Sequence, residues 1–315
     1  MNTTEQRRLA LTLATKTSAA LGAGRAPTPC LKDLFHGLAH LRGVVSRDDW
    51  AALCRDVFLP HPLSEVLLAD PLTRRALEKP RGYAGDAIMM DMIYSEGEFG
   101  PGWMKATGLG SAIHRFILSR PTSEGVRGRR RVIAGHIEAL TRDRHNVEVL
   151  SVACGHLREA RLVSASAARN IRRLTAFDQD EESLREVSRS LPGWAIEEVP
   201  GSIRRLIVGG EDLGSYDLIY SLGLYDYLAQ PAAERLTASL FKLLKPGGRL
   251  VIANFLPITS SAYMEAFMDW HLVYRAPEDL WGLRSQIAPE VLQGTQYAVE
   301  ESGTVGLISF GRCAA

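Results

Sequence analysis

The chain has 315 residues, of which 46% are hydrophobic and 23% charged, which is ordinary for a globular protein. Lys and Arg together number 37 against 36 for Asp and Glu, so the formal net charge is only +1. This balance argues against a general electrostatic affinity for nucleic acid or for an anionic membrane surface.

Four scattered cysteines, Cys30, Cys54, Cys154 and Cys313, form no C-x-x-C pair. We therefore expect neither a metal site nor a disulfide framework, and we expect a cytoplasmic location. Residues 1–17 lack the apolar core of a signal peptide. No run of about 18 apolar residues occurs, so we expect no membrane span.

Residues 1–140 are predicted to form a mainly helical domain. Apolar positions recur at helical spacing from Leu31 to about Leu77, and further helices are expected over 110–119 and 125–140. These helices could also form the interface of a homodimer. In the last of them, Arg127, Arg129, Arg130 and Arg131 are expected to be solvent-exposed, with an anion or partner contact as the alternative.

The segment RGYAGD, residues 81–86, differs from its helical surroundings. Arg, Tyr and Asp placed around two glycines favour a lid or a part of a ligand site. A structural turn before a helix is the alternative. We expect Arg81 to pair with a carboxylate of a bound ligand, and Tyr83 and Asp86 to face the same site.

From residue 141 onwards, strands and helices alternate. Strands are expected over 147–153, 173–177, 194–199, 216–221 and 249–255, and helices over 157–169, 180–190 and 231–243. Such alternation predicts an α/β fold with a parallel sheet. QYAVEES and VGLISFGR add an antiparallel hairpin. We predict a second domain over 141–315, with an acceptor-side insertion at 256–290.

The stretch VEVLSVACGHLRE, residues 147–159, carries the strongest functional signal. An apolar run ends in a small-residue turn at Ala153, Cys154 and Gly155, and a second apolar run ends in Asp178. A strand, a Gly turn, a helix and a strand tipped by an acid suit a nucleotide-type ligand, with the acid on the ribose hydroxyls. Asp178 could instead be only a helix N-cap. Glu159 either reaches back to the turn or merely occupies a first helical turn.

Two phosphate-binding patterns are missing from the chain, G-x-G-x-x-G and G-x-x-x-x-G-K-[ST]. An adenosine without phosphates therefore fits better than a dinucleotide or a nucleoside triphosphate. This preference points to S-adenosylmethionine.

Five segments in order resemble the class I S-adenosylmethionine-dependent methyltransferases over roughly residues 130–315. They are VEVLSVACGHLRE, AFDQD, YDLIYSLGLYDYL (216–228), LLKPGGRLVIANF (243–255) and the terminal hairpin. The resemblance implies a Rossmann-like sheet, S-adenosylmethionine as cofactor and S-adenosylhomocysteine as product. The cofactor-binding residues that it implies are Ala153, Cys154, Gly155, Glu159, Asp178, Gln179, Ser202, Ser221, Leu222 and Gly223.

Two features depart from that family. Its first motif usually carries two or three glycines, whereas Gly155 stands nearly alone here. After the third strand the family often has an acid near the adenine amine, where this chain has Ser202, a weaker acceptor.

The acceptor side is predicted to lie beyond the fourth and fifth strands. Proton transfer is assigned to Tyr225, Asp226, Asp86 and His271, with no metal. Acceptor binding is assigned to Tyr227, Tyr263, Glu265, Asp269, Trp270 and Tyr274. Aromatic faces together with carboxylates suit a cation, so a polar amine or guanidine such as an amino acid is favoured as acceptor. A carboxylate acceptor would need Arg81 or Arg275 to face inward.

RGYAGD and YMEAFMDWHLVYR, residues 263–275, also resemble a bacterial subgroup associated with methyl esters of hydroxylated fatty acids. Three functions follow from these patterns. The first is N-methylation of a small polar amine, the second is carboxyl O-methylation of a hydroxy fatty acid, and the third is non-catalytic cofactor binding. We expect no nucleic-acid or membrane partner.

Overall fold

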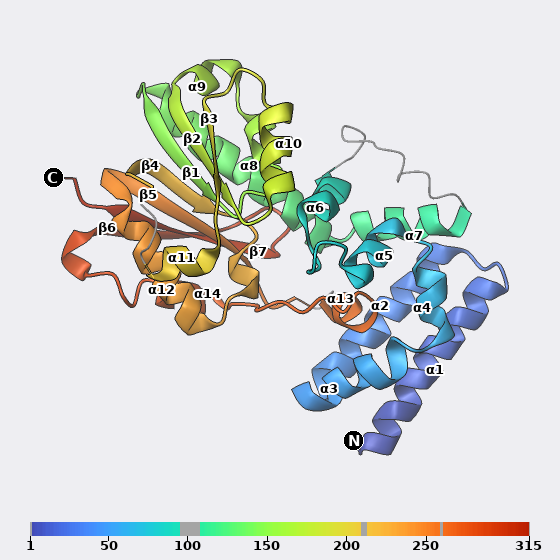
Figure 1. The fold of residues 1–315 in the computed structure, drawn as a ribbon. Coiled ribbons are helices and arrows are strands. Elements are labelled where there is room, and N and C mark those ends of the chain that lie inside the picture. The colour runs from blue at the N-terminus through green and yellow to red at the C-terminus, as the bar shows by residue number, and fades with distance from the viewer. Residues whose placement is uncertain (1, 95–107, 209–212, 259–260, 315) are drawn as a thin grey trace. The chain divides into compact units, whose positions relative to one another are not determined.

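The computed structural model describes residues 2–94, 108–208, 213–258 and 261–314 (Figure 1). Contacts divide the chain into two compact units. The helical unit comprises Met1–Glu124 with Ile258–His271, and the sheet unit comprises Gly125–Pro257 with Leu272–Ala315. We predicted a boundary after residue 140, whereas the contacts change within α8 (Pro121–Arg142).

The helical unit gathers its helices around an aromatic core. In chain order they are α1 (Thr3–Gly22), α2 (Pro27–Val44), α3 (Arg47–Leu53), η1 (Cys54–Phe58), α4 (Pro62–Leu67), α5 (Pro71–Glu78), α6 (Ala87–Tyr94) and α7 (Gly108–Leu118). α13 (Ser261–Phe267) joins them from much later in the chain, because it packs on α2 and η1. Its Tyr263 ring stacks on Phe35 with centroids 4.6 Å apart.

The sheet unit contains seven strands in the order β3-β2-β1-β4-β5-β7-β6. They are β1 (Val147–Val152), β2 (Ile171–Asp178), β3 (Ile196–Pro200), β4 (Tyr216–Ser221), β5 (Leu244–Phe255), β6 (Leu292–Val299) and β7 (Val305–Arg312). β1 to β5 are parallel, and β7 is antiparallel to both β5 and β6. The predicted α/β sheet with a C-terminal antiparallel hairpin is confirmed.

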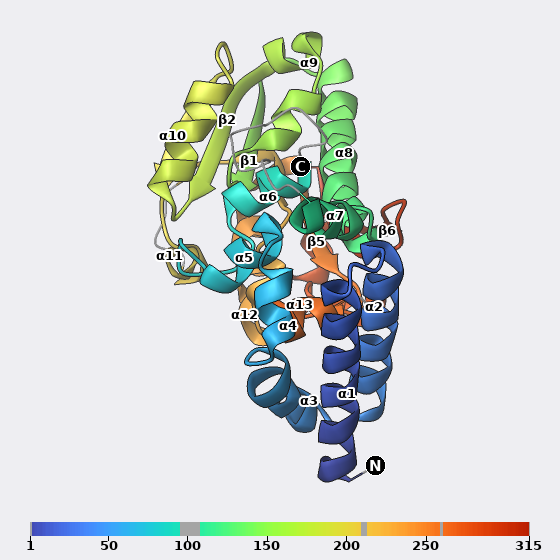
Figure 2. The ribbon, with the colours of Figure 1, turned by 90° about the vertical axis from the view of Figure 1, so that its right-hand side faces the viewer.

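Helices cover both faces of this sheet. Figure 2 shows the strands between α8 on one face and α10 (Glu181–Ser190) on the other. The remaining elements are η3 (Arg158–Leu162), α9 (Ala165–Arg169), α11 (Ile203–Val208), η4 (Tyr225–Tyr227), α12 (Gln230–Lys242), α14 (Pro277–Gly282) and η5 (Pro289–Val291). The central strand β1 is buried along its whole length, as expected for a parallel strand covered on both faces.

The prediction of one continuous helix over 157–169 is wrong. The chain instead forms the 3₁₀ helix η3, an extended residue at Val163 and the short helix α9. Leu157 adopts a left-handed conformation and Ser164 caps α9 by accepting from the N–H of Ala167. Apolar periodicity alone does not detect such a break, because the break depends on backbone dihedrals. Among the described residues, no helix is long and apolar enough to span a bilayer.

Candidate functional site

The order of the strands reverses direction at the middle of the sheet. The chain proceeds outward from β1 through β2 to β3 and then returns to β4 on the other side of β1. Ligands of open parallel sheets bind outside the carboxyl ends of the strands at such a reversal. The turn after β1 and the segments after β2, β4 and β5 are therefore the first places to look for a site.

The turn after β1 has the left-handed backbone that is typical of a glycine-rich loop, although Gly155 is its single glycine. Ala153, Gly155 and Leu157 all have positive φ, at 53°, 51° and 51°. Glycine adopts this left-handed region without penalty, whereas other residues are strained there. Ala153 and Leu157 therefore occupy positions that would suit glycine, and both are strained there.

Asp178 ties this turn to the end of β2. Its Oδ2 accepts from the N–H of Gly155 at 2.8 Å, and its Oδ1 accepts from the N–H of Asp180 at 3.0 Å. Each carboxylate oxygen keeps a second lone pair for a ligand hydroxyl. Burial raises the pKa of Asp178, while these two backbone hydrogen bonds oppose the rise. The N-cap of α10 is Asp180, so Asp178 is not merely the cap of that helix.

The other residues of the sheet unit that were predicted to bind the cofactor lie near the same ends of the strands. The N–H of Cys154 donates to the carbonyl of Phe177 at 3.2 Å, and burial raises the pKa of the Cys154 thiol. Gln179 is exposed at the end of β2. Ser202 is half-buried just before α11, beside the end of β3. Burial also raises the pKa of Glu159.

Two of the side chains predicted to bind the cofactor, Glu159 and Ser221, form hydrogen bonds within the protein. Glu159 accepts from the Tyr220 hydroxyl of β4 at 2.9 Å, and the Ser221 hydroxyl donates to the carbonyl of Val152 at 3.0 Å. The first bond holds η3 on the end of β4, and the second holds the ends of β1 and β4 together. The role of Tyr220 could not be predicted from the sequence, because a tyrosine within an apolar strand resembles any other core residue.

Asp226 is a buried carboxyl group at the ends of β4 and β5. Its Oδ1 accepts from the N–H of Phe255 at 2.7 Å, and its Oδ2 lies 3.8 Å from Nη1 of Arg129. Burial raises the pKa of Asp226 to about 6, although Arg129 and the Phe255 hydrogen bond oppose the rise. A carboxyl group with this pKa can exchange a proton near neutral pH.

The expectation for the arginine cluster is wrong for three of its four members. Arg127, Arg129 and Arg130 of α8 are buried, and only Arg131 is exposed. Arg129 also lies beside Gly223, where an added Cβ would be 3.4 Å from its Nη2. Arg129 therefore lines the same strand ends as Asp226, which a basic run in the sequence did not reveal.

Tyr225 and Arg275 do not have the contacts expected of site residues. Tyr225 is fully buried and its hydroxyl bonds Thr237 Oγ1 at 3.1 Å, so it is a core residue. Arg275 is 1% exposed and donates to four acceptors in the sheet unit. These are the carbonyls of Tyr225 and Leu228 and the side chains of Asn254 and Gln230. Near them, Leu222 is buried, Tyr274 is half-buried and Tyr227 is 39% exposed.

In the helical unit, RGYAGD leads into α6. Gly82 and Gly85 have φ of 87° and 78°, and Arg81 and Tyr83 are half-buried. Asp86 accepts from the N–H of Met89 at 2.8 Å and forms a two-point ion pair with Arg75 at 2.6 and 2.9 Å. Its carboxylate is thus engaged as a helix cap and a salt-bridge partner.

The segment that contains α13 lies in the same unit and contacts the approach to RGYAGD. Lys79 Nζ lies 2.5 Å from Asp269 Oδ2, and Asp269 also bonds the exposed His271 at 3.2 Å. Two segments that the sequence singled out, far apart along the chain, are thereby brought together.

The other predicted acceptor residues of this segment are buried. Glu265 accepts from Arg42 at 2.7 and 2.9 Å and from the Trp50 indole at 2.6 Å. Tyr263 bonds Thr73 at 3.1 Å, and Trp270 is 6% exposed. These contacts hold α13 within the helical unit.

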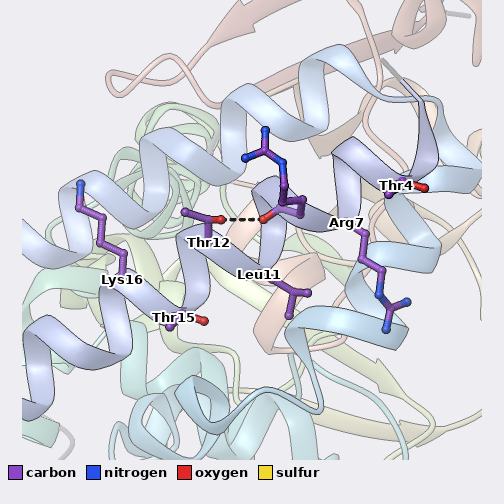
Figure 3. A pocket seen from close by; sticks show the side chains of 7 residues that line it. Thr4, Arg7, Leu11, Thr12, Thr15 and Lys16 are labelled. Atoms are coloured by element: carbon purple, nitrogen blue, oxygen red, sulfur yellow. Dashed lines mark hydrogen bonds between the residues drawn. The ribbon is translucent and has the colours of Figure 1, made fainter.

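A surface depression runs along α1 of the helical unit, with a volume of about 590 Å³ (Figure 3). It is lined by residues of a single helix, and Arg7 and Lys16 point away from each other in it. Among the described residues, no three His, Cys, Asp or Glu side chains gather as a metal site would require. We therefore retain the strand ends of the sheet unit as the candidate site.

Comparisons with known proteins bear on this site. Residues 149–248 match the model of a methyltransferase domain family. This match, with the fold, supports a class I methyltransferase domain that uses S-adenosylmethionine. No curated protein matches the chain.

Two of the solved structures that resemble this chain are similar over most of its length. A possible exported protein from Bordetella parapertussis is 19% identical, with a TM-score of 0.60, and covers 87% of this chain and 98% of its own. The magnesium protoporphyrin IX methyltransferase ChlM from Synechocystis PCC 6803, with bound S-adenosylhomocysteine, is 12% identical, with a TM-score of 0.50. The match covers 77% of this chain and 100% of ChlM. At these identities, the likeness establishes the fold.

Proposed function

We propose that this protein transfers a methyl group from S-adenosylmethionine to a small polar acceptor, with an amine nitrogen favoured. The turn at Ala153–Gly155 and the carboxylate of Asp178 fit an adenosine, because they offer a closely approachable backbone and free lone pairs on a buried acid. The sulfonium of the cofactor supplies an already activated methyl group. The chain must then orient the acceptor, exclude water and manage one proton.

Asp226 is the observation that carries the preference for an amine. A protonated amine must lose a proton before nitrogen can attack, and a carboxylate whose pKa is about 6 is ionised and able to accept one at neutral pH. The hydrogen bond from Phe255 and the nearby Arg129 hold this carboxyl group in place. We therefore propose Asp226 as the general base and Arg129 as a residue that positions it.

The contacts in the helical unit weaken one argument for an amine and leave a second candidate open. Asp86, Glu265 and Asp269, which suggested a site for a cation, already pair with basic side chains. A carboxylate acceptor would therefore meet less negative charge than the sequence indicated. Methyl-ester formation on a hydroxy fatty acid is for this reason the second candidate.

A methyl-transfer screen with product masses tests these proposals. Amino acids, other amines and hydroxy fatty acids would be offered with S-adenosylmethionine, and the position of the added methyl group would be read by fragmentation. N-methyl products support the proposal, whereas methyl esters support the second candidate. Tight binding of S-adenosylmethionine with no product from any acceptor class would favour a non-catalytic role.

A further inference from the structure

A second pocket of the helical unit lies between the start of α2 and the C-terminal part of α7, with a volume of about 340 Å³. Its walls include Thr28 and Lys32 from α2, Arg115 and Phe116 from α7, and Ser119 and Arg120 just beyond α7. Among the residues that the structure describes, no acidic side chain lines it. Its size is in the range of pockets that bind small molecules.

Three positive charges surround this pocket without an anionic partner. Within the described chain, no carboxylate forms an ion pair with Lys32, Arg115 or Arg120. Arg115 donates to the hydroxyl of Ser111 at 2.6 Å, and Arg120 donates weakly to Ser119 at 3.4 Å, and both acceptors are neutral. Like charges around one pocket repel each other, so an anion bound there would relieve an unfavourable interaction.

Arg120 is oriented by its surroundings. Its guanidinium lies over the Phe116 ring, with Cζ 4.4 Å from the centroid, and its buried Nε has no acceptor among the described residues. A stacked guanidinium of this kind can present its Nη groups to an oxyanion in the pocket, because the planar group matches the spacing of phosphate oxygens. α2 adds to the positive field, since no side chain caps it and its first turn has no acid.

Stabilisation of the α7 dipole explains only part of this arrangement. A cation in the last turn of a helix is favourable, which accounts for Arg115. The same effect does not account for Lys32, which belongs to a different helix. The α1 depression also has basic side chains, but Arg7 and Lys16 diverge there (Figure 3).

We propose that the pocket between α2 and α7 binds a small phosphomonoester. Arg120 and Arg115 contact the phosphate oxygens, Lys32 adds charge, and the hydroxyls of Thr28 and Ser119 complete the polar lining. Ala112 and Phe116 contribute the apolar part of the lining. The proposal is independent of the methyl-transfer function, because it rests only on residues of the helical unit.

Calorimetric titration of the full chain with inorganic phosphate and with phenyl phosphate tests this proposal. We expect both to bind, phenyl phosphate more tightly, with affinities that fall as salt is raised. Arg120→Met should weaken binding of phenyl phosphate at least tenfold. Arg47→Met, which removes one exposed charge of α3 outside the pocket, should change the dissociation constant less than twofold.

A second variant guards against misfolding of the first. Ser119 is exposed, so Ser119→Asp should fold normally, as circular dichroism would verify, and should abolish binding by placing a negative charge at the rim. The proposal is overturned if wild-type protein binds neither probe at millimolar concentration. Equal weakening by Arg47→Met and Arg120→Met, or unchanged binding in Ser119→Asp, would also overturn it.

Discussion

Among single residues, Asp178 has the clearest consequence for cofactor binding. Asp178→Ala should weaken binding of S-adenosylhomocysteine at least about 100-fold, because two hydrogen bonds to a charged acceptor are worth roughly 1.5–3 kcal/mol each. Calorimetry measures the affinity, and circular dichroism checks the fold, since the N–H groups of Gly155 and Asp180 also lose their acceptor. Asp178→Asn, which keeps one acceptor oxygen, should lose less. Unchanged affinity in Asp178→Ala would remove this residue from the proposed site.

The left-handed conformation of Ala153 predicts a stabilising substitution. A non-glycine residue in this region costs about 1–3 kcal/mol, whereas the extra unfolded-state freedom of glycine costs about 0.4–1 kcal/mol. Ala153→Gly should therefore raise the melting temperature measured by scanning calorimetry. The control is Ala51→Gly in the right-handed helix α3, where the same change should lower it. A lower melting temperature in Ala153→Gly would mean that the turn is not strained.

Asp226 predicts the pH dependence of turnover. The carboxyl group is protonated below its pKa of about 6 and cannot act as a base there, so activity should rise with pH through about 6. Asp226→Asn should lower the turnover number about 100-fold or more and remove this dependence. Its affinity for S-adenosylmethionine should change little.

Tyr225→Phe supplies the matched control for Asp226→Asn. It removes a neighbouring hydroxyl that bonds Thr237 within the core, so turnover should stay close to that of the wild type. Equal losses of turnover in the two variants would contradict the proposed role of Asp226.

At the scale of elements, α13 depends on one buried carboxylate. Glu265 accepts hydrogen bonds from Arg42 and from Trp50, and its side chain is only 6% exposed. Glu265→Ala should lower the free energy of unfolding by about 2–3 kcal/mol, because a buried donor then loses its acceptor and an ion pair is broken. Urea denaturation followed by tryptophan fluorescence measures this change.

The exposed ion pair between Arg74 and Glu78 supplies the control for α13. Both side chains are at least half exposed, at 50% and 58%. Glu78→Ala should change the stability by less than about 0.5 kcal/mol, as is usual for a surface pair. A similar loss in the two variants would mean that Glu265 is no more important than a surface charge.

At the scale of the whole molecule, the division into two units predicts that cofactor binding can be separated from turnover. The residues proposed to hold the cofactor at the strand ends, among them Gly155 and Asp178, belong to the sheet unit. A chain of residues 125–257 joined by a short Gly-Ser linker to 272–315 should still bind S-adenosylhomocysteine. We expect it to lose methyl transfer, because RGYAGD and residues 263–271 are proposed acceptor elements.

Full turnover by this shortened chain would show that the helical unit is not needed for the reaction. Deleting residues 1–90 alone would be a poorer experiment. It removes the helices on which α13 packs, and the buried rings of Tyr263 and Phe267 would then be exposed.

The sequence by itself determined the sheet, its terminal hairpin and the positions of the glycine turn and Asp178. These features depend on local periodicity and on the topology of parallel strands, both of which are written along the chain. The tertiary structure decided which charged side chains form ion pairs within the protein. Asp86, Glu265 and Asp269 pair with Arg75, Arg42 and Lys79, and Arg129 is buried beside Asp226. Such pairings join residues distant in sequence, and burial sets their energy, so no pattern of neighbouring residues could reveal them.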